Sequence, residues 1–246
     1  MLSKDRLRGS LLRCLALTGL PRPQAADLLT SLASPSGAVI LPDTDFWMPR
    51  GLADYKETTL VYNDQFLSLD NRKALTSWWL IKVRSARLPN WDIASTCTIE
   101  GRKGLLLVEA KAHDQELSGA GKSAPTSHNS KLNHERIGQA IAEANSGLNT
   151  VLKTDWNLTR DSHYQLCNRF AWSWKIASLG VPVALIYLGF LNAREMLDQG
   201  RPFASASAWE NCLRHYSGGI VPDEAWGNKF YITGTPVWFL IKSLAR

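Results

Sequence analysis

Residues 90–111 read NWDIASTCTIEGRKGLLLVEAK, and their pattern is the most informative in the chain. Two segments of β-type residues flank a turn bounded by glycines, so the pattern predicts a β-hairpin. Side chains alternate between the two faces of a strand, which places Glu109 and Lys111 on one face of the second strand. Asp92 has the parity that puts it on the same face. Ionisable groups are costly to bury among apolar neighbours, so we expect these three to share a function.

The register of this hairpin follows from the position of its turn. A turn centred on Arg102-Lys103 predicts that Thr96 faces Glu109. Asp92 then lies on the shared face, but roughly 13 Å along the strand from the position opposite Glu109, at ~3.3 Å per residue. For the two carboxylates to meet, we expect a bend or a bulge where the first strand begins.

Asp92 and Glu109 offer hard carboxylate oxygens, which suit Mg²⁺ or Mn²⁺. Mg²⁺ usually keeps several waters and takes one or two carboxylates together with phosphate oxygens of a substrate. Lys111 lies close enough in sequence to approach the same phosphate or the attacking water, so the combination favours phosphodiester hydrolysis. The alternative is a half-exposed hairpin with Glu109 and Lys111 solvated or paired at the surface. The apolar run Leu105–Val108 favours a buried central strand instead.

The segments Asn90-Trp91-Asp92 and Glu109-Ala110-Lys111, with sixteen residues between them, resemble the PD-(D/E)xK nuclease superfamily. Trp91 stands where the family pattern has proline. The resemblance implies the restriction-endonuclease-like fold, an α/β fold built as a three-layer α/β/α sandwich around a central mixed sheet. It also implies that Asp92, Glu109 and the Ala110 carbonyl are metal ligands and that Lys111 is the catalytic lysine.

Further residues are candidates for supporting such a site. Gln165 and Arg169 are spaced i, i+4 on a predicted helix and therefore share a face. Some branches of the resembling family place a glutamine on a helix after the Glu-x-Lys strand, where it contacts the site, and Gln165 fits this place better than Gln139. Arg169 is predicted with equal weight to form a structural ion pair or a phosphate contact. His113 shares the strand parity of Lys111, and it either borders the metal site or leaves the sheet as a polar residue.

The region before Asp92 offers additional acids. In the resembling family a helix that precedes the Asp strand sometimes adds another carboxylate. Glu57, Asp64 and Asp70 are the candidates here, although a helix cap or a surface charge is the favoured role for each.

The rest of the chain is typical of a single α/β domain. We expect one nuclease-like domain over residues 1–246, with 1–60 and 200–246 as peripheral extensions. The apolar segment Val181–Leu188 is predicted to be a buried strand that runs parallel to the Leu105 strand. Apolar spacing predicts helices over 3–18, 24–31, 68–86, 132–146, 164–178 and 207–216, and strands over 230–232 and 237–241.

Composition limits the classes of protein that fit. The 246 residues carry a formal charge of +6, which fits a polyanionic partner. No apolar run reaches the ~18 residues of a membrane span, so we expect no membrane contact. The four cysteines are scattered without paired spacing, which indicates reduced thiols in a cytoplasmic protein and neither zinc nor disulfides.

The segment Gly119-Ala120-Gly121-Lys122-Ser123 imitates the end of a phosphate-binding loop for ATP. The full pattern needs a glycine where this chain has Glu116, and Pro125 would disrupt the helix that should follow. We therefore predict a mobile loop over 118–130, and we expect its Lys122 and the Lys131 that follows it to meet a DNA backbone.

Taken together, these patterns predict a divalent-metal-dependent nuclease that uses Mg²⁺ or Mn²⁺ and acts on DNA in preference to RNA. The sequence leaves open whether the protein forms a homodimer. One alternative is a catalytically silent nucleic-acid-binding or assembly protein that retains the nuclease fold. Another is an enzyme that acts on a different phosphate-bearing substrate, because a fold alone does not determine function.

Overall fold

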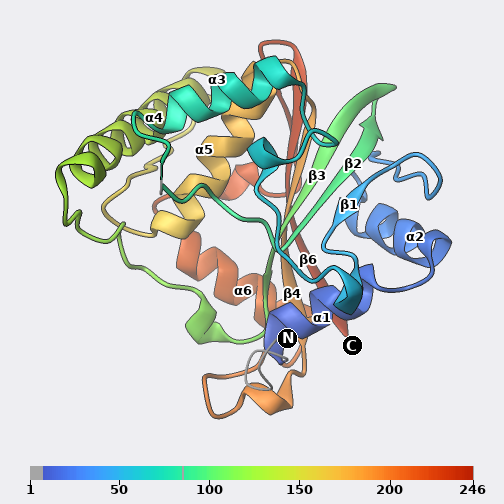
Figure 1. Ribbon diagram of the computed structural model, residues 1–246. Helices are drawn as coiled ribbons and strands as arrows, with labels where there is room; N and C mark the ends of the chain where they lie inside the picture. The colour runs from blue at the N-terminus through green and yellow to red at the C-terminus, as the bar shows by residue number, and fades with distance from the viewer. Residues whose placement is uncertain (1–7, 85, 246) are drawn as a thin grey trace.

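The computed structural model describes residues 8–84 and 86–245 of the chain. At its centre lies a six-stranded sheet with the order β1-β2-β3-β4-β6-β5 (Figure 1). The contacts of β4 with β3 and with β6 are parallel, whereas the other contacts are antiparallel. The strands are β1 (Trp47–Met48), β2 (Ile93–Ile99), β3 (Arg102–Lys111), β4 (Val183–Leu191), β5 (Lys229–Ile232) and β6 (Thr235–Ala245).

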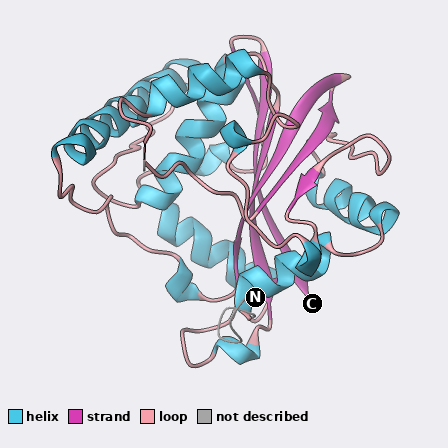
Figure 2. Ribbon diagram, viewed as in Figure 1, coloured by secondary structure: helices cyan, strands magenta, loops and turns pink. Residues whose placement is uncertain are grey.

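Helices lie on both faces of this sheet, as Figure 2 shows on either side of the magenta strands. The chain therefore has the predicted α/β architecture with a mixed central sheet. No helix in residues 8–84 and 86–245 combines the length and the hydrophobicity needed to cross a membrane. One face carries α1 (Gly9–Thr18) and α2 (Arg22–Ala33), and the other carries α3 (Leu69–Trp79), α4 (His128–Leu152), α5 (Tyr164–Ser178) and α6 (Ala206–Ser217).

Strand β3 separates two apolar cores. Leu105 and Leu107 pack into the core beneath α3, α4, α5 and α6. Leu106 and Val108 point the other way, into the core beneath α1 and α2. All four side chains are fully buried. The continuous apolar run is thus a central strand, as predicted, and the half-exposed hairpin is excluded.

The hairpin turn lies earlier in the chain than the sequence suggests. Its central residues are Glu100 and Gly101, with φ values of 50° and 72°. Two residues with positive φ are the geometry of a type I′ turn, which suits the twist of a two-residue hairpin. Arg102 then pairs with Ile99 and already belongs to β3, so the predicted turn at Arg102-Lys103 and its register are wrong.

The sequence pattern suggests that Gly104 bounds the turn, but in the structure this residue lies within β3. A Cβ atom at this position would lie 2.8 Å from the backbone oxygen of Pro182, just before β4. Because glycine has no Cβ atom, β3 and the residue that precedes β4 can approach this closely. Leu105, the next residue, pairs with Val183 of β4, and this pairing confirms the predicted parallel contact.

Helix α5 has the bounds predicted for it, whereas α3 ends at Trp79 instead of continuing to residue 86. Ser68 caps α3 as expected, because its side chain accepts a hydrogen bond from the Asn71 amide. The early end has a tertiary cause. Asn133 of α4 accepts hydrogen bonds from the amides of Ile81 and Lys82 at 3.0 and 2.8 Å. These backbone groups are thereby satisfied outside a helix.

The regions expected to be peripheral belong to the body of the domain. Strand β6 lies inside the sheet, between β4 and β5, so residues 200–246 are not an extension. The N-terminal region supplies α1, α2 and strand β1, which together cover one face and one edge of the sheet. Of the predicted helix over 3–18, residues 3–7 lie outside the described part of the chain. The four cysteines are unpaired, as expected.

Candidate active site

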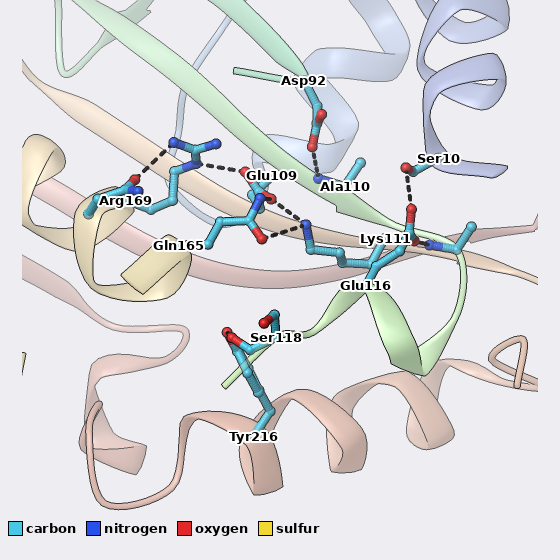
Figure 3. Close-up of polar contacts among 12 residues, drawn as sticks. Ser10, Asp92, Glu109, Ala110, Lys111, Glu116, Ser118, Gln165, Arg169 and Tyr216 are labelled. Carbon is cyan, nitrogen blue, oxygen red and sulfur yellow. Dashed lines mark hydrogen bonds and ion pairs between the residues drawn. The ribbon is translucent and has the colours of Figure 1, made fainter. Parts of the chain in front are cut away.

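Asp92 lies directly before β2 and reaches across to β3. Its Oδ2 accepts a hydrogen bond of 2.7 Å from the Ala110 amide (Figure 3). The observed register, continued by one residue, places Asp92 opposite Glu109. The separation expected from the sequence is therefore absent, because the turn lies earlier than predicted. The chain bends at Asp92, as expected, and no bulge interrupts the pairing of β2 with β3.

Glu109 is the centre of the site and is only 1% exposed. Its Oε2 accepts a hydrogen bond from Nε of Arg169 at 2.6 Å. Its Oε1 accepts from Nε2 of Gln165 at 2.7 Å and also from Nζ of Lys111. Lys111 Nζ donates in addition to the Gln165 Oε1 at 3.4 Å. These side chains come from β3 and from the first turns of α5, so the packing of that helix on the sheet assembles the cluster (Figure 3).

Burial and neighbouring charges give the three motif groups different protonation behaviour. Burial, followed by repulsion from Glu109, raises the pKa of Asp92 from 3.8 to about 7, although Lys111 and the Ala110 amide oppose the rise. Burial acts to raise the pKa of Glu109, but attraction by Arg169 and Lys111 outweighs it and the pKa is lowered. Burial disfavours the charge on Lys111, yet Glu109 and Asp92 raise its pKa overall. Lys111 is therefore a stable ammonium at neutral pH, whereas Asp92 titrates near neutrality.

Arg169 forms the structural ion pair that the sequence left open against a phosphate contact. Besides its bond to Glu109, its Nη1 donates to Oδ1 of Asn168 at 2.9 Å. The guanidinium carbon lies 4.7 Å from the centre of the Trp91 ring, in a cation–π contact. Trp91 thus packs against the guanidinium group that binds Glu109. Sequence reasoning missed this role of Trp91.

The other predicted supporting residues lie in different places. Gln165 contacts the cluster as predicted, but Gln139 is exposed on α4 and its side chain makes no hydrogen bond within the described residues. His113 leaves the sheet and packs against Gly200, and no contact joins it to Asp92 or Glu109 in the part of the chain that the structure describes. Of the two alternatives left open for His113, the structure therefore favours the polar residue that leaves the sheet.

Of the upstream acids, Glu57 lies near enough to Asp92 to raise its pKa, after larger contributions from burial and Glu109. Asp70 is exposed in the first turn of α3. Asp64 is also exposed and accepts a hydrogen bond from its neighbour Gln65. Only Glu57 therefore bears on the electrostatics of the site.

Glu116 holds the chain as it leaves β3, a role that sequence reasoning missed. Its Oε2 accepts hydrogen bonds from the amides of Ala112 and His113, the latter at 3.3 Å. Its Oε1 accepts from the Ser10 hydroxyl of α1 at 2.8 Å. This carboxylate ties the end of β3 to the opposite helical layer and so fixes the backbone beside Lys111. A local signal existed, since a residue three positions after His113 can cap its backbone.

The groups around Asp92 fit a hard divalent cation. Within the described residues, the neutral Ala110 amide is the only hydrogen-bond donor to this partly buried carboxylate, which also faces the charge of Glu109. A cation would compensate that charge, although Glu109 would have to share its oxygens with its present donors. No group of three or more His, Cys, Asp or Glu side chains suited to a metal occurs in residues 8–84 and 86–245. Two carboxylates still suffice for Mg²⁺, which takes its other ligands from water and substrate.

Comparison with known proteins finds no family model, no curated protein and no solved structure that matches this chain.

Proposed function

We propose that this chain is a divalent-metal-dependent nuclease with a restriction-endonuclease-like fold, which hydrolyses phosphodiester bonds and prefers DNA to RNA. The observation that supports this most is the partly buried Asp92 carboxylate, which lies opposite Glu109 and lacks a cationic hydrogen-bond partner among the described residues. An under-compensated carboxylate of this kind destabilises a fold, and such groups cluster where function requires them.

The chemistry assigns a distinct task to each residue. Asp92, Glu109 and the Ala110 carbonyl would hold Mg²⁺ or Mn²⁺, which supplies Lewis acidity and a more acidic water. In the reaction, the oxygen of water bonds to phosphorus while its proton passes to solvent, one phosphorus–oxygen ester bond breaks, and the leaving oxygen takes up a proton from solvent. Lys111 is an ammonium, so it offsets the negative charge that develops on the phosphate and orients the attacking water. It does not accept the proton of that water.

Gln165 and Arg169 position these groups. Gln165 binds both Glu109 and Lys111, so it fixes their relative orientation. Arg169 binds the second oxygen of Glu109. Because its guanidinium is buried against Trp91, we assign it no contact with the substrate phosphate. We expect both residues to act through Glu109.

A second candidate is the catalytically silent nucleic-acid-binding protein. The observation in its favour is that three side-chain donors already engage the two oxygens of Glu109. A carboxylate held in this way is stable without a metal. Metal binding distinguishes the two candidates, because a silent scaffold gains no stability from Mg²⁺ or Mn²⁺ whereas a metal site does.

The test is an assay of linear, circular and single-stranded DNA, and of RNA, with Mg²⁺ or Mn²⁺ and with EDTA. We expect metal-dependent cleavage by the wild type and its loss in Asp92→Ala and Lys111→Ala. Lys103→Ala is the matched control for Lys111→Ala, because Lys103 is exposed at the far end of the same strand.

Cleavage that persists in both Asp92→Ala and Lys111→Ala, with folded protein shown by circular dichroism, rejects this mechanism. Absence of cleavage on every substrate, together with no stabilisation by either metal ion, favours the silent scaffold instead. Hydrolysis of small phosphodiesters without hydrolysis of nucleic acid indicates a different phosphate-bearing substrate.

A further inference from the structure

The loop after β3 is held in place where it passes the start of α5. Backbone hydrogen bonds join it to residues 160–164: Lys122 N to Arg160 O at 2.9 Å, and Tyr164 N to Ala120 O at 3.0 Å. Gly121 packs so closely on Asp161 that a Cβ atom there would overlap the carbonyl of Asp161. The first part of the loop expected to be mobile is therefore fixed, and it presents Lys122 at a defined place.

The Lys122 ammonium has an unusual environment for a surface lysine. It lies 4.8 Å from the centre of the Tyr164 ring and is half-buried. Within the described residues it forms no ion pair and no side-chain hydrogen bond, and burial lowers its pKa. A cation that is partly desolvated without a carboxylate partner is expected where an anion binds.

Lys122 lines a cavity of about 310 Å³ that opens to solvent. The cavity lies between the segment before β2, the loop over 122–126 and the first turns of α4. Arg87 and His134 also line it, together with hydroxyl groups such as those of Ser123 and Thr126, and no Asp or Glu contributes to its described lining. Arg87 is exposed and forms no ion pair within the described residues. At ~30 Å³ per water, the volume corresponds to about ten water molecules, enough for a phosphate group.

This cavity and the acidic centre flank the same turn of α5. Tyr164 holds Lys122 over its ring, and the next residue, Gln165, binds Glu109 and Lys111. Tyr164 and Gln165 are consecutive residues of α5, so one helical turn contacts both the lysine of the cavity and the acidic centre.

We propose that Lys122 and Arg87 form a subsite for a backbone phosphate of a nucleic-acid strand, adjacent to the phosphate at the acidic centre. Contacts to the phosphate backbone position a strand without reading its sequence. Anion binding by the cavity stands on its own geometry, whereas the role of the subsite in placing a scissile phosphate rests on the proposed function. Lys122 and Arg87 are positioning residues in this scheme, since neither touches the reacting centre.

The test measures binding without cleavage. A short fluorescent DNA duplex and its single strand are titrated in EDTA over a series of NaCl concentrations, with wild type, Lys122→Gln, Arg87→Gln and the double variant. We expect each single change to weaken binding about tenfold and to reduce the slope of log affinity against log salt by about one, and the double change by about two. Lys103→Gln removes the same charge from an exposed lysine at the far end of β3 and is the control.

Because Arg87 is exposed, Arg87→Gln remains informative even if Lys122→Gln fails to fold, which thermal unfolding detects. Affinities and salt slopes of both single variants that equal those of Lys103→Gln overturn the subsite. A wild type that binds neither DNA nor RNA overturns it as well.

A cleavage assay separates this proposal from the proposed function. If the variants lose affinity and salt slope as expected but the wild type cleaves nothing, the subsite holds and the nuclease assignment fails. If the wild type cleaves and the variants bind and cleave normally, the nuclease assignment holds and the subsite is overturned. Where both are correct, Lys122→Gln raises KM and leaves kcat at saturating DNA nearly unchanged.

Discussion

Asp92 and Glu109 carry the same charge side by side, yet only Glu109 has cationic hydrogen-bond partners among the described residues. The result is an asymmetric pair, in which the pKa of Glu109 is lowered and the pKa of Asp92 is raised to about 7. Two carboxylates in one site with opposite shifts are a common way to divide chemical roles. In the metal-free protein the same asymmetry should appear as a dependence of stability on pH.

Asp92→Asn should remove that dependence. The pKa of Asp92 is about 7 in the folded protein and 3.8 as its ordinary value, so the folded state retains its proton to higher pH. Stability is therefore full below the ordinary value and is lost as pH rises through the folded one. In EDTA, we expect Asp92→Asn and the wild type to have the same free energy of unfolding at about pH 4. At about pH 8, we expect the free energy of unfolding of Asp92→Asn to be higher than that of the wild type by about 2–4 kcal/mol.

Urea unfolding at both pH values measures this difference, and Asp43→Asn, at an exposed aspartate, is the control. Equal stability of Asp92→Asn and wild type at the higher pH would show that the carboxylate is adequately compensated.

At the scale of elements, the β2–β3 hairpin illustrates how closely a register depends on its turn. The sequence contains two glycines near the turn, Gly101 and Gly104, and local chemistry does not distinguish them. Gly101 has φ 72° in the turn itself. Gly104 is required by its distance to Pro182, a residue far away in the chain. Long-range contact therefore decided which glycine closes the hairpin, and with it whether Asp92 meets Glu109.

Gly104→Ala should destabilise the protein through this contact. The added Cβ atom would lie 2.8 Å from the Pro182 oxygen, so β3 and β4 would have to separate locally. We expect a loss of about 1–3 kcal/mol in the free energy of unfolding.

Gly101→Asn is the control for Gly104→Ala, since asparagine tolerates the positive φ of a type I′ turn and no atom lies within 4 Å of a Cβ there. Guanidinium unfolding of the two variants measures the contrast. A Gly104→Ala protein as stable as wild type would mean that the approach of the strands is not a constraint.

At the scale of the whole molecule, the sheet is completed by the end of the chain. Strand β6 inserts between β4 and β5, so residues far from the motif carry part of the core beneath α5. Phe239 of β6 contacts the ring of Phe170 at 4.7 Å between centroids, and Phe170 belongs to the helix that presents Gln165 and Arg169. The placement of the site thus depends on a strand that has no motif residue.

Phe239→Ala should therefore cost far more than a change on the neighbouring edge strand. Phe239 is 0% exposed, and we expect a loss of about 3–5 kcal/mol in the free energy of unfolding. Tyr231 of β5 is 48% exposed, so Tyr231→Ala serves as the control, with an expected loss below about 1 kcal/mol. Chemical denaturation monitored by tryptophan fluorescence compares them, and equal losses would show that β6 is not a core strand.

By itself, the sequence determined the features that depend on local periodicity. A period of two placed Glu109 and Lys111 on one face, the apolar run made β3 a buried strand, and helical spacing set the bounds of α5. Tertiary contacts set the register that joins Asp92 to Glu109, the contacts of Gln165 and Arg169 with Glu109, and the place of β6 in the sheet. Periodicity acts between neighbours along the chain, whereas register, ion pairing and strand order depend on contacts between residues that only folding brings together.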